Sequence, residues 1–219
     1  FAISIYQLAV GFPIPIILAL MLNEIRFPRY KKAVQTILYA PHFISIVVMV
    51  GIIITMFSPS IGVINTIRER LGLERVYYMA QPSAFRHLYV WSGVWQGMGW
   101  SAIIYISALS AVDIQLYEAA RIDGAGRIKQ MLHITFPSIL PTVVTMLILQ
   151  MGQIMGVSFD KVLLMQNAAT YEVSDIISTY VYRRGLEGSQ YSYAAAVDLF
   201  SSVINLLMLC STNAISKRL

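Results

Sequence analysis

The sequence predicts an all-α fold, namely a polytopic helical membrane protein with about five spans. The 219 residues are 57% hydrophobic and only 12% charged, with a mean hydropathy of +0.66. A soluble domain usually has about 45–50% apolar and about 25% charged residues. The composition therefore excludes an ordinary soluble enzyme, a disordered chain and a coiled coil. The net charge of +5 is no evidence for nucleic-acid binding, because membrane proteins collect Lys and Arg in their loops.

Five apolar stretches approach the length of about 20 residues that a helix needs to cross a bilayer. The first is interrupted by Pro13 and Pro15, which neighbouring helices can accommodate inside a membrane. The second has Pro41 near its start. We expect the five spans at about Phe1–Leu22, Val34–Phe57, Leu88–Val112, Ile139–Val157 (or on to Met165) and Tyr193–Ile215.

Basic residues in the connections predict the orientation of these spans. Asn23–Ala33, Asp113–Ser138 and the chain end with Lys217 and Arg218 hold nine basic residues in short segments. Ser58–His87 and Ser158–Ser192 hold seven in much longer ones. Because Lys and Arg accumulate in cytoplasmic loops, the first set and the C-terminus are expected in the cytoplasm.

Small residues at helical spacing predict where helices approach closely in lipid. They form one face in the third span and one in the fourth. These positions are Gly93, Gly97, Ser101, Gly152 and Gly156.

The cytoplasmic segment 113–138 reads as two helical pieces. Asp113 is a good N-cap for the first piece, Leu116–Asp123, and Gly124 is a good helix terminator. The second piece, Gly126–Phe136, is amphipathic and suits the membrane interface, and Pro137 is expected to end it.

The first of these pieces suits insertion into a groove of another protein. Ala119 and Ala120 leave its surface nearly flat, and Glu118, Arg121 and Asp123 place charges around it. A short helix can dock in a groove, and a flanking carboxylate can pair with a groove arginine. The segment is therefore predicted to be a rigid cytoplasmic contact for a protein partner.

The same segment resembles a known signature. Glu118-Ala119-Ala120, Gly124, Ile134 and Pro137 stand at the spacing of the "EAA" motif in permease subunits of binding-protein-dependent ABC importers. Further stretches resemble the carbohydrate branch of that family, in particular permeases for polysaccharides or oligosaccharides. They are Phe12–Leu20, Asn23–Arg26, Tyr39–Ser45 and Tyr191–Val197.

The resemblance implies a type I ABC importer permease fold, with residues 1–219 as one transmembrane permease domain in a bacterial plasma membrane. The family has a further N-terminal span, so we expect an N-terminally truncated chain with five of six spans. The implied partners are a second homologous permease, two cytoplasmic ATPase subunits, an extracytoplasmic binding protein and a saccharide.

The resemblance also implies which residues couple the chain to its ATPase. They are Glu118, Ala119, Ala120, Asp123 and Gly124, with Glu118 as the charged anchor. ATP and Mg²⁺ would be bound by the partner ATPase. We expect no catalytic residue, metal site or cofactor in this chain, which lacks both a G-x-x-x-x-G-K loop and an H-E-x-x-H motif.

Polar and aromatic residues within the spans are candidates for the substrate path, because polar groups in lipid are often functional. Sugars are bound by amides and carboxylates together with aromatic faces. The alternative is that the aromatic residues anchor the helices at the interface and the amides bridge helices. The candidates are Trp95, Gln96, Trp100, Gln150, Gln153 and Asn205, beside the further polar positions Tyr105, Asp198 and Ser201.

Three alternatives stand beside this interpretation. A permease of the same superfamily could carry an amino acid, phosphate or a metal. A stand-alone secondary transporter would need intramembrane charges or internal repeats, and only Asp198 is a candidate. An intramembrane enzyme would need a paired carboxylate or an activated nucleophile, and no span holds such a pair.

Overall fold

The computed structural model describes residues 1–216, and every regular element in that range is a helix. Lys217 and Arg218, which entered the charge count, lie outside the described residues. The first elements are α1 (Ala2–Gly11), α2 (Pro13–Asn23), α3 (Pro28–Tyr39), η1 (Ala40–Phe43), α4 (Ile46–Met56), α5 (Val63–Arg70), η2 (Tyr78–Ala80) and α6 (Pro82–Ser110). The remaining elements are α7 (Ile114–Ile122), α8 (Arg127–Gln130), η3 (Met131–Thr135), α9 (Phe136–Met151), α10 (Phe159–Met165), α11 (Tyr171–Ser174), α12 (Ile177–Val181), η4 (Tyr182–Glu187) and α13 (Tyr191–Ser216).

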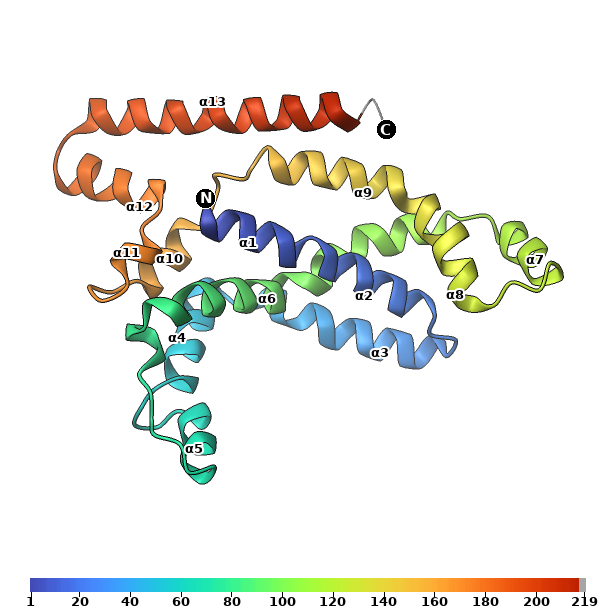
Figure 1. Cartoon of the computed structure of the whole chain (residues 1–219), viewed down its shortest axis with the longest axis horizontal. Coiled ribbons are helices and arrows are strands. Elements are labelled where there is room, and N and C mark those ends of the chain that lie inside the picture. The colour runs from blue at the N-terminus through green and yellow to red at the C-terminus, as the bar shows by residue number, and fades with distance from the viewer. Residues whose placement is uncertain (217–219) are drawn as a thin grey trace.

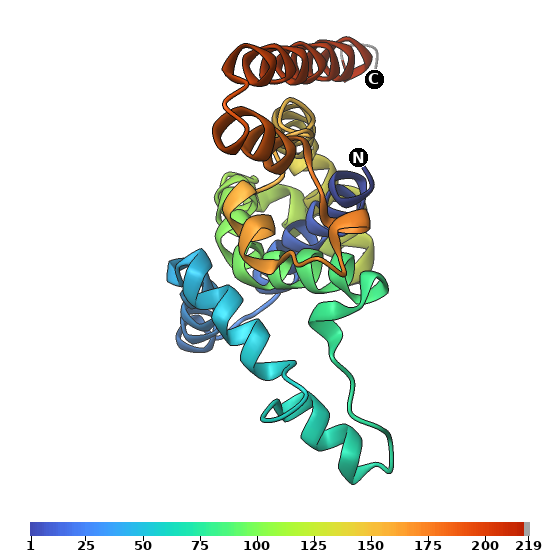
Figure 2. The same cartoon turned by 90° about the vertical axis from the view of Figure 1, so that its left-hand side faces the viewer.

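Helix α6 is the central element of the bundle. Its 29 residues extend about 43 Å at 1.5 Å per residue, long enough to cross a bilayer. Helices α1, α2, α3 and α9 all pack against it (Figure 1). Helix α13 packs on α9 and η4 and forms an outer layer at the top of Figure 2. Helix α6 covers most of the third predicted span and begins at Pro82, six residues before the expected start. It qualifies as a candidate span only together with α7, from which it is bent by 69°.

Two cores hold α6 in place. One lies where α6 meets α1, α4 and α10, and it includes Phe85, Tyr89, Met49 and Val162. The other lies further along α6, against α2 and α9. Outside these cores many apolar side chains are exposed at the surface of the bundle, as a lipid-facing surface requires.

The first and fifth predicted spans are confirmed. Ala2–Asn23 and Tyr191–Ser216 are each long and apolar enough to cross a membrane, as is Arg127–Met151. Pro13 opens α2, so α1 and α2 continue as one span of 22 residues. The described part of the chain has three such helices, or five when each of two bent pairs is counted as one span.

The prediction of a continuous second span over Val34–Phe57 is wrong. Helix α3 and the 3₁₀ segment η1 run beside α6, and α4 then turns away with a bend of 97°. The chain is extended at Ile44, and Ser45 caps α4 by accepting a hydrogen bond from the Val48 N–H at 3.3 Å. Gln96 of α6 donates to the Ile44 carbonyl at 2.6 Å, which stabilises the peptide group that the turn frees from helical bonding.

The expected start and end of the fourth span are also wrong. Pro137 does not end a separate interfacial helix, because α8, η3 and α9 form one helix over Arg127–Met151. Segment η3 is a π-helix, and its wider turn lets the chain pass Pro137, which lacks an N–H and sits in the first turn of α9. The helix ends at Met151 rather than at Val157 or Met165, and a turn separates it from α10.

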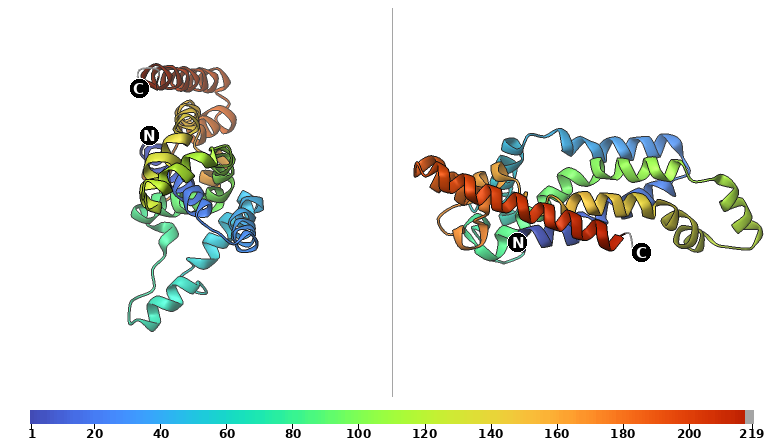
Figure 3. Two further views of the ribbon diagram at one scale, coloured as in Figure 1. Left: turned by 90° about the vertical axis from the view of Figure 1, so that its right-hand side faces the viewer. Right: turned by 90° about the horizontal axis from the view of Figure 1, so that it is seen from above.

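The molecule has two ends along the α6 axis. The α2–α3 connection and α7 lie at one end, which we call the α7 end, and α13 runs toward it (Figures 1 and 3). The α4–α5 and α10–α12 segments lie at the other, which we call the opposite end. This division matches the two sets of connections that the basic residues distinguished.

Candidate functional site

Helix α7 is capped at both termini by side-chain and backbone groups of its own sequence. Asp113 is the N-cap, and its carboxylate accepts a hydrogen bond from the Gln115 N–H at 2.9 Å. At the other terminus the Gly124 N–H donates to the Arg121 carbonyl at 3.1 Å and the Ala125 N–H to the Ala120 carbonyl at 2.8 Å. These two bonds form a Schellman motif.

Gly124 has a positive φ of 77°, a conformation in which a residue with a Cβ is strained. The motif around it therefore requires glycine. The predicted N-cap Asp113 and terminator Gly124 are confirmed, although the helix begins at Ile114, two residues before the expected Leu116.

The predicted coupling residues lie on an exposed helix at the end of the molecule (Figure 1). Glu118, Ala119, Asp123 and Gly124 are exposed and Ala120 is half-buried. No residue of α7 is buried. Apolar side chains are exposed beside the charges, with Ile122 at 87% of its surface. Helix α7 thus presents both charged and apolar side chains at its surface.

A hydrogen bond that sequence reasoning missed holds α7 against the base of the long helix. The Tyr117 hydroxyl donates to Thr135 Oγ1 at 3.1 Å. Thr135 is the last residue of the π-helical segment η3 and is only 1% exposed. The Gln130 amide donates to the Ala125 carbonyl at 2.7 Å and ties down the loop after α7. No local pattern marks the Tyr117–Thr135 pair, because the two residues are 18 positions apart and the α7–α8 loop lies between them.

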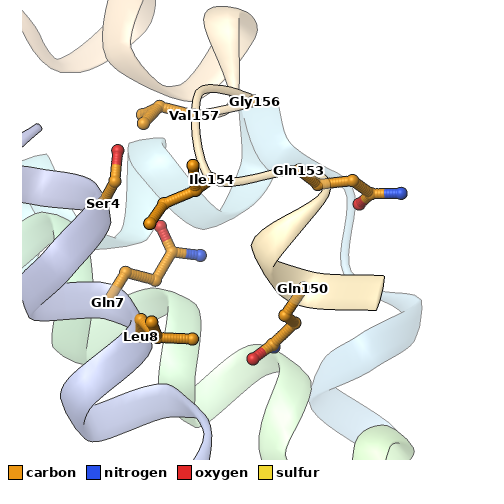
Figure 4. Close-up of a pocket in the computed structure, with 8 residues that line it drawn as sticks. All are labelled: Ser4, Gln7, Leu8, Gln150, Gln153, Ile154, Gly156 and Val157. Carbon is orange, nitrogen blue, oxygen red and sulfur yellow. The ribbon is translucent and has the colours of Figure 1, made fainter. Parts of the chain in front are cut away.

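Two of the predicted path residues border the same cavity. Gln150 and Gln153 line a space of about 140 Å³ between α1 and the C-terminal end of α9 (Figure 4). Gln7 and Ser4 of α1 line it as well. In Figure 4 the Gln7 and Gln150 side chains extend into the space between the helices, whereas Gln153 extends away from it. Gln153 lies in the turn after α9 rather than in the span.

Sequence reasoning missed Gln7. The rule that selected Gln150, a polar side chain in an apolar span, applies to it equally.

The other four path candidates lie elsewhere. Gln96 bonds the Ile44 carbonyl, as described above, and Asn205 Oδ1 accepts from the Met155 N–H at 3.1 Å. Each amide thus ties its helix to the backbone of a connecting segment, a structural role close to the helix-bridging alternative considered above. Trp100 stacks on the His42 ring with 4.4 Å between the ring centroids, and Trp95 is about half exposed. The structure does not bring the six candidates into one site.

Aromatic and basic side chains gather at the opposite end. The Tyr6 hydroxyl lies 2.8 Å from His87 Nδ1 and accepts a hydrogen bond from Trp91 Nε1 at 2.9 Å. Arg86 precedes His87 at the start of α6, and its Nε atom is buried without a hydrogen-bond partner. Three rings from α1 and α6 are therefore fixed beside a guanidinium group.

The same end contains a buried lysine. Lys161 of α10 is 5% exposed, and its ammonium donates to the Tyr89 carbonyl at 2.8 Å and lies 4.6 Å from the centre of the Tyr89 ring. Burial lowers the pKa of Lys161 to about 8, because an interior site disfavours the charged form. Lys161 therefore packs against α6 and is not accessible to a substrate.

Similar proteins share this helical arrangement. The chain is 43% identical over 212 residues to the polygalacturonan/rhamnogalacturonan transport system permease protein YteP of Bacillus subtilis, a match covering 97% of this chain and 66% of YteP. It is 41% identical to Protein LplB of the same organism, covering 97% of this chain and 67% of LplB. The chain thus spans about two thirds of the length of these relatives.

Solved structures match the fold over the whole chain. A chain in the crystal structure of a bacterial ABC transporter involved in the import of the acidic polysaccharide alginate superposes with a TM-score of 0.97 at 43% identity. The match covers 100% of this chain and 76% of that one. A chain of the bacterial alginate ABC transporter in complex with alginate pentasaccharide-bound periplasmic protein gives a TM-score of 0.96, with 99% and 75% covered.

The family model described as "Binding-protein-dependent transport system inner membrane component" matches residues 11–219. Because the model covers nearly the whole chain, the chain belongs to this family of inner membrane components.

Proposed function

We propose that this chain is the membrane-spanning permease subunit of an ATP-driven importer for an oligosaccharide or polysaccharide delivered by an extracytoplasmic binding protein. The observation that carries the proposal is α7: a helix with both ends capped, no buried residue and exposed carboxylates, held at the end of an apolar bundle. Family membership and the saccharides named for the relatives support the substrate class.

Helix α7 would dock in a groove of a cytoplasmic ATPase, with Glu118 pairing with a basic residue of the groove. Ala119 and Ala120 would allow close approach. The α7 end and the C-terminus would then lie in the cytoplasm and the opposite end would face the binding protein. ATP and Mg²⁺ would be bound and hydrolysed by the ATPase subunits, while this chain supplies the path.

Transport would follow from two packings of the bundle. ATP binding moves the docked α7 helices of this chain and of a second, homologous permease, and the loaded binding protein favours the same outward-facing packing. Each ligand shifts the equilibrium only by its difference in affinity for the two packings. The Tyr117–Thr135 hydrogen bond would carry the displacement of α7 into the α8–η3–α9 helix.

The test uses the full-length permease purified with its partner permease and ATPase and reconstituted in lipid. We expect the saccharide-loaded binding protein to stimulate ATP hydrolysis and saccharide uptake. A complex that assembles but is not stimulated by any loaded binding protein would refute the proposed function.

The coupling role of α7 is tested by Glu118→Arg and Gly124→Val. We expect each to reduce stimulated ATP hydrolysis and uptake at least ~10-fold while the membrane part stays folded, because the anchor charge is reversed in one and the Schellman motif is strained in the other. Glu24→Arg and Gly126→Ser are matched controls, since both residues are exposed near the same end and Gly126 has an ordinary φ of −68°. Normal stimulation in either α7 variant would contradict the assignment.

A further inference from the structure

An open cavity of about 450 Å³ lies at the opposite end, between the first turns of α1 and the start of α6. Tyr6, Ser83, Arg86 and His87 line it, with smaller or apolar residues around them. Ligand pockets of this size typically combine aromatic surface with a few polar groups that fix orientation. No carboxylate is among the lining residues, so the charge that faces this space comes from Arg86.

The aromatic part of the cavity is held rigidly. Tyr6 and His87 meet edge to face with 5.4 Å between their ring centroids. The Tyr6 hydroxyl is engaged on two sides, by His87 and by Trp91. A ring positioned in this way loses little side-chain freedom when a flat apolar face, such as that of a pyranose, packs against it.

The guanidinium of Arg86 has unused bonding capacity. Its Nε is buried without a hydrogen-bond partner, and no carboxylate of the described residues lies within ion-pair distance of it. Asp175 lines an adjoining cavity that Arg86 also borders, but Arg183 holds that carboxylate at 2.5 Å. Glu172 lines the adjoining cavity too and not this one. Arginine binds planar carboxylates through two parallel hydrogen bonds.

We propose that this cavity is an entry subsite for acidic saccharides, in which Arg86 binds the carboxylate of a uronic acid unit and Tyr6 packs against its ring. The inference rests on the proposed function, because only an importer with its opposite end toward the binding protein presents this cavity to a saccharide. It goes further by assigning a place and a charge preference for the substrate.

The test measures binding to the full-length permease in its complex with partner permease and ATPase, without nucleotide or binding protein. The two probes are the galacturonate trisaccharide and its methyl ester, which share the same rings and differ in charge. We expect the acid to bind at least ~10-fold more tightly than the ester, equivalent to about 1.4 kcal/mol, with a preference that falls as salt is added. Equal binding of the two probes would overturn the inference, and the cluster would then be an aromatic anchor at the membrane interface.

Arg86 is tested by three variants. Arg86→Gln is expected to reduce the acid-to-ester ratio to about 1, and Arg86→Lys to restore part of it as a point charge. Arg184→Gln removes the same charge from an exposed site at the same end, outside the cavity, and is expected to keep the full ratio. An unchanged ratio in Arg86→Gln, or an equal loss in Arg184→Gln, would overturn the assignment.

Tyr6 gives an independent check. Tyr6→Ala is expected to weaken binding of both probes by a similar factor of about 5, while Tyr6→Phe keeps the ring and most of the binding. If Tyr6→Ala binds each probe as tightly as the wild type does, the stacking role is refuted. Stimulation of ATP hydrolysis by loaded binding protein is recorded on each preparation: its presence without any acid preference refutes the subsite alone, and its absence in the wild type refutes the proposed function.

Discussion

The two ends of the molecule are organised by different kinds of contact. At the α7 end, the helix is defined by its own residues, from the Asp113 cap to Gly124. Within residues 1–216, two side-chain hydrogen bonds tie the α7 segment to the long helix, Tyr117–Thr135 and Gln130–Ala125. At the opposite end, side chains bond groups far away in sequence, as in Lys161 with the Tyr89 backbone carbonyl, 72 residues away. This difference is consistent with the proposed roles, since a docking helix has to stay exposed and movable, whereas a ligand-binding surface has to be held in shape.

Helix α6 joins the two ends, so a substitution that destabilises its packing is expected to have the largest effect on both of them. A Cβ on Gly99 would lie 2.1 Å from the Leu38 carbonyl oxygen of α3, and backbone atoms cannot give way without moving the helix. We expect Gly99→Ala to lower the free energy of unfolding by about 2–3 kcal/mol, measured by thermal unfolding in lipid or detergent. Both ends of the molecule should lose stability.

Gly97→Ala is the matched control on the same helix. A Cβ there meets nothing within 4 Å, and alanine has the better helix propensity by about 1 kcal/mol. We expect unchanged or slightly raised stability. Equal destabilisation by the two variants would show that the α3–α6 contact does not depend on close approach at Gly99.

The Gly97 and Gly99 pair also shows a limit of sequence reasoning. The spacing of Gly93, Gly97 and Ser101 predicted one close helix–helix face. On that face a Cβ at Gly93 would meet only the Lys161 side chain, at 3.2 Å from Nζ, whereas the close approach of another helix's backbone is at Gly99, on another side of α6. In contrast, Gly152 does face α13, since a Cβ there would lie 2.7 Å from Leu209 Cδ1. Small residues show that a helix can be approached, and only the position of the neighbour decides where.

Replacing Lys161 tests whether the opposite end depends on packing rather than on charge. Lys161→Met removes the burial of an ammonium group and keeps a flexible apolar chain. We expect it to raise the free energy of unfolding at pH 7 by about 1–2 kcal/mol, as replacement of buried ions by apolar residues often does. Stimulation of ATP hydrolysis through α7 should be unchanged.

The lowered pKa of Lys161 predicts how stability changes with pH. The pKa of Lys161 falls from its usual 10.5 to about 8 in the fold, so the unfolded chain binds more protons between these values. Stability should therefore rise with pH from about 8 to 10.5, and the burial penalty is fully present below pH 8. The advantage of Lys161→Met should shrink at pH 9.5, while Lys32→Met, at an exposed position, should show neither effect. A constant advantage across pH would mean that packing alone explains the stabilisation.

The α7 end could be predicted from sequence in detail, because caps and terminators act within a few residues. Asp113 forms the N-cap hydrogen bond and Gly124 the helix-terminating one, as their residue types predict. The same local rules failed at Pro137, and they did not predict the bend before α4, although Ser45 itself is an ordinary N-cap. There the outcome depended on a π-helical turn and on Gln96, which is 52 residues from its acceptor. The Tyr6–His87–Trp91 cluster was missed for the same reason, since Tyr6 is more than 80 residues from the other two members.

The Tyr117–Thr135 hydrogen bond joins α7 to a residue outside its own helix. Removing this bond is the test with the smallest expected effect. We expect Tyr117→Phe to leave α7 formed, because its caps remain, and to cost about 1 kcal/mol in the free energy of unfolding, the usual net value of such a bond. Because displacement of α7 would then reach α9 less directly, ATP hydrolysed per saccharide imported should rise about 2-fold. Thr135→Val should give the same shift, and the double variant should add little to either single change, since both remove one interaction. Additive effects of the two changes would show that Tyr117 and Thr135 act through separate contacts and that α7 is linked to α9 by the backbone alone.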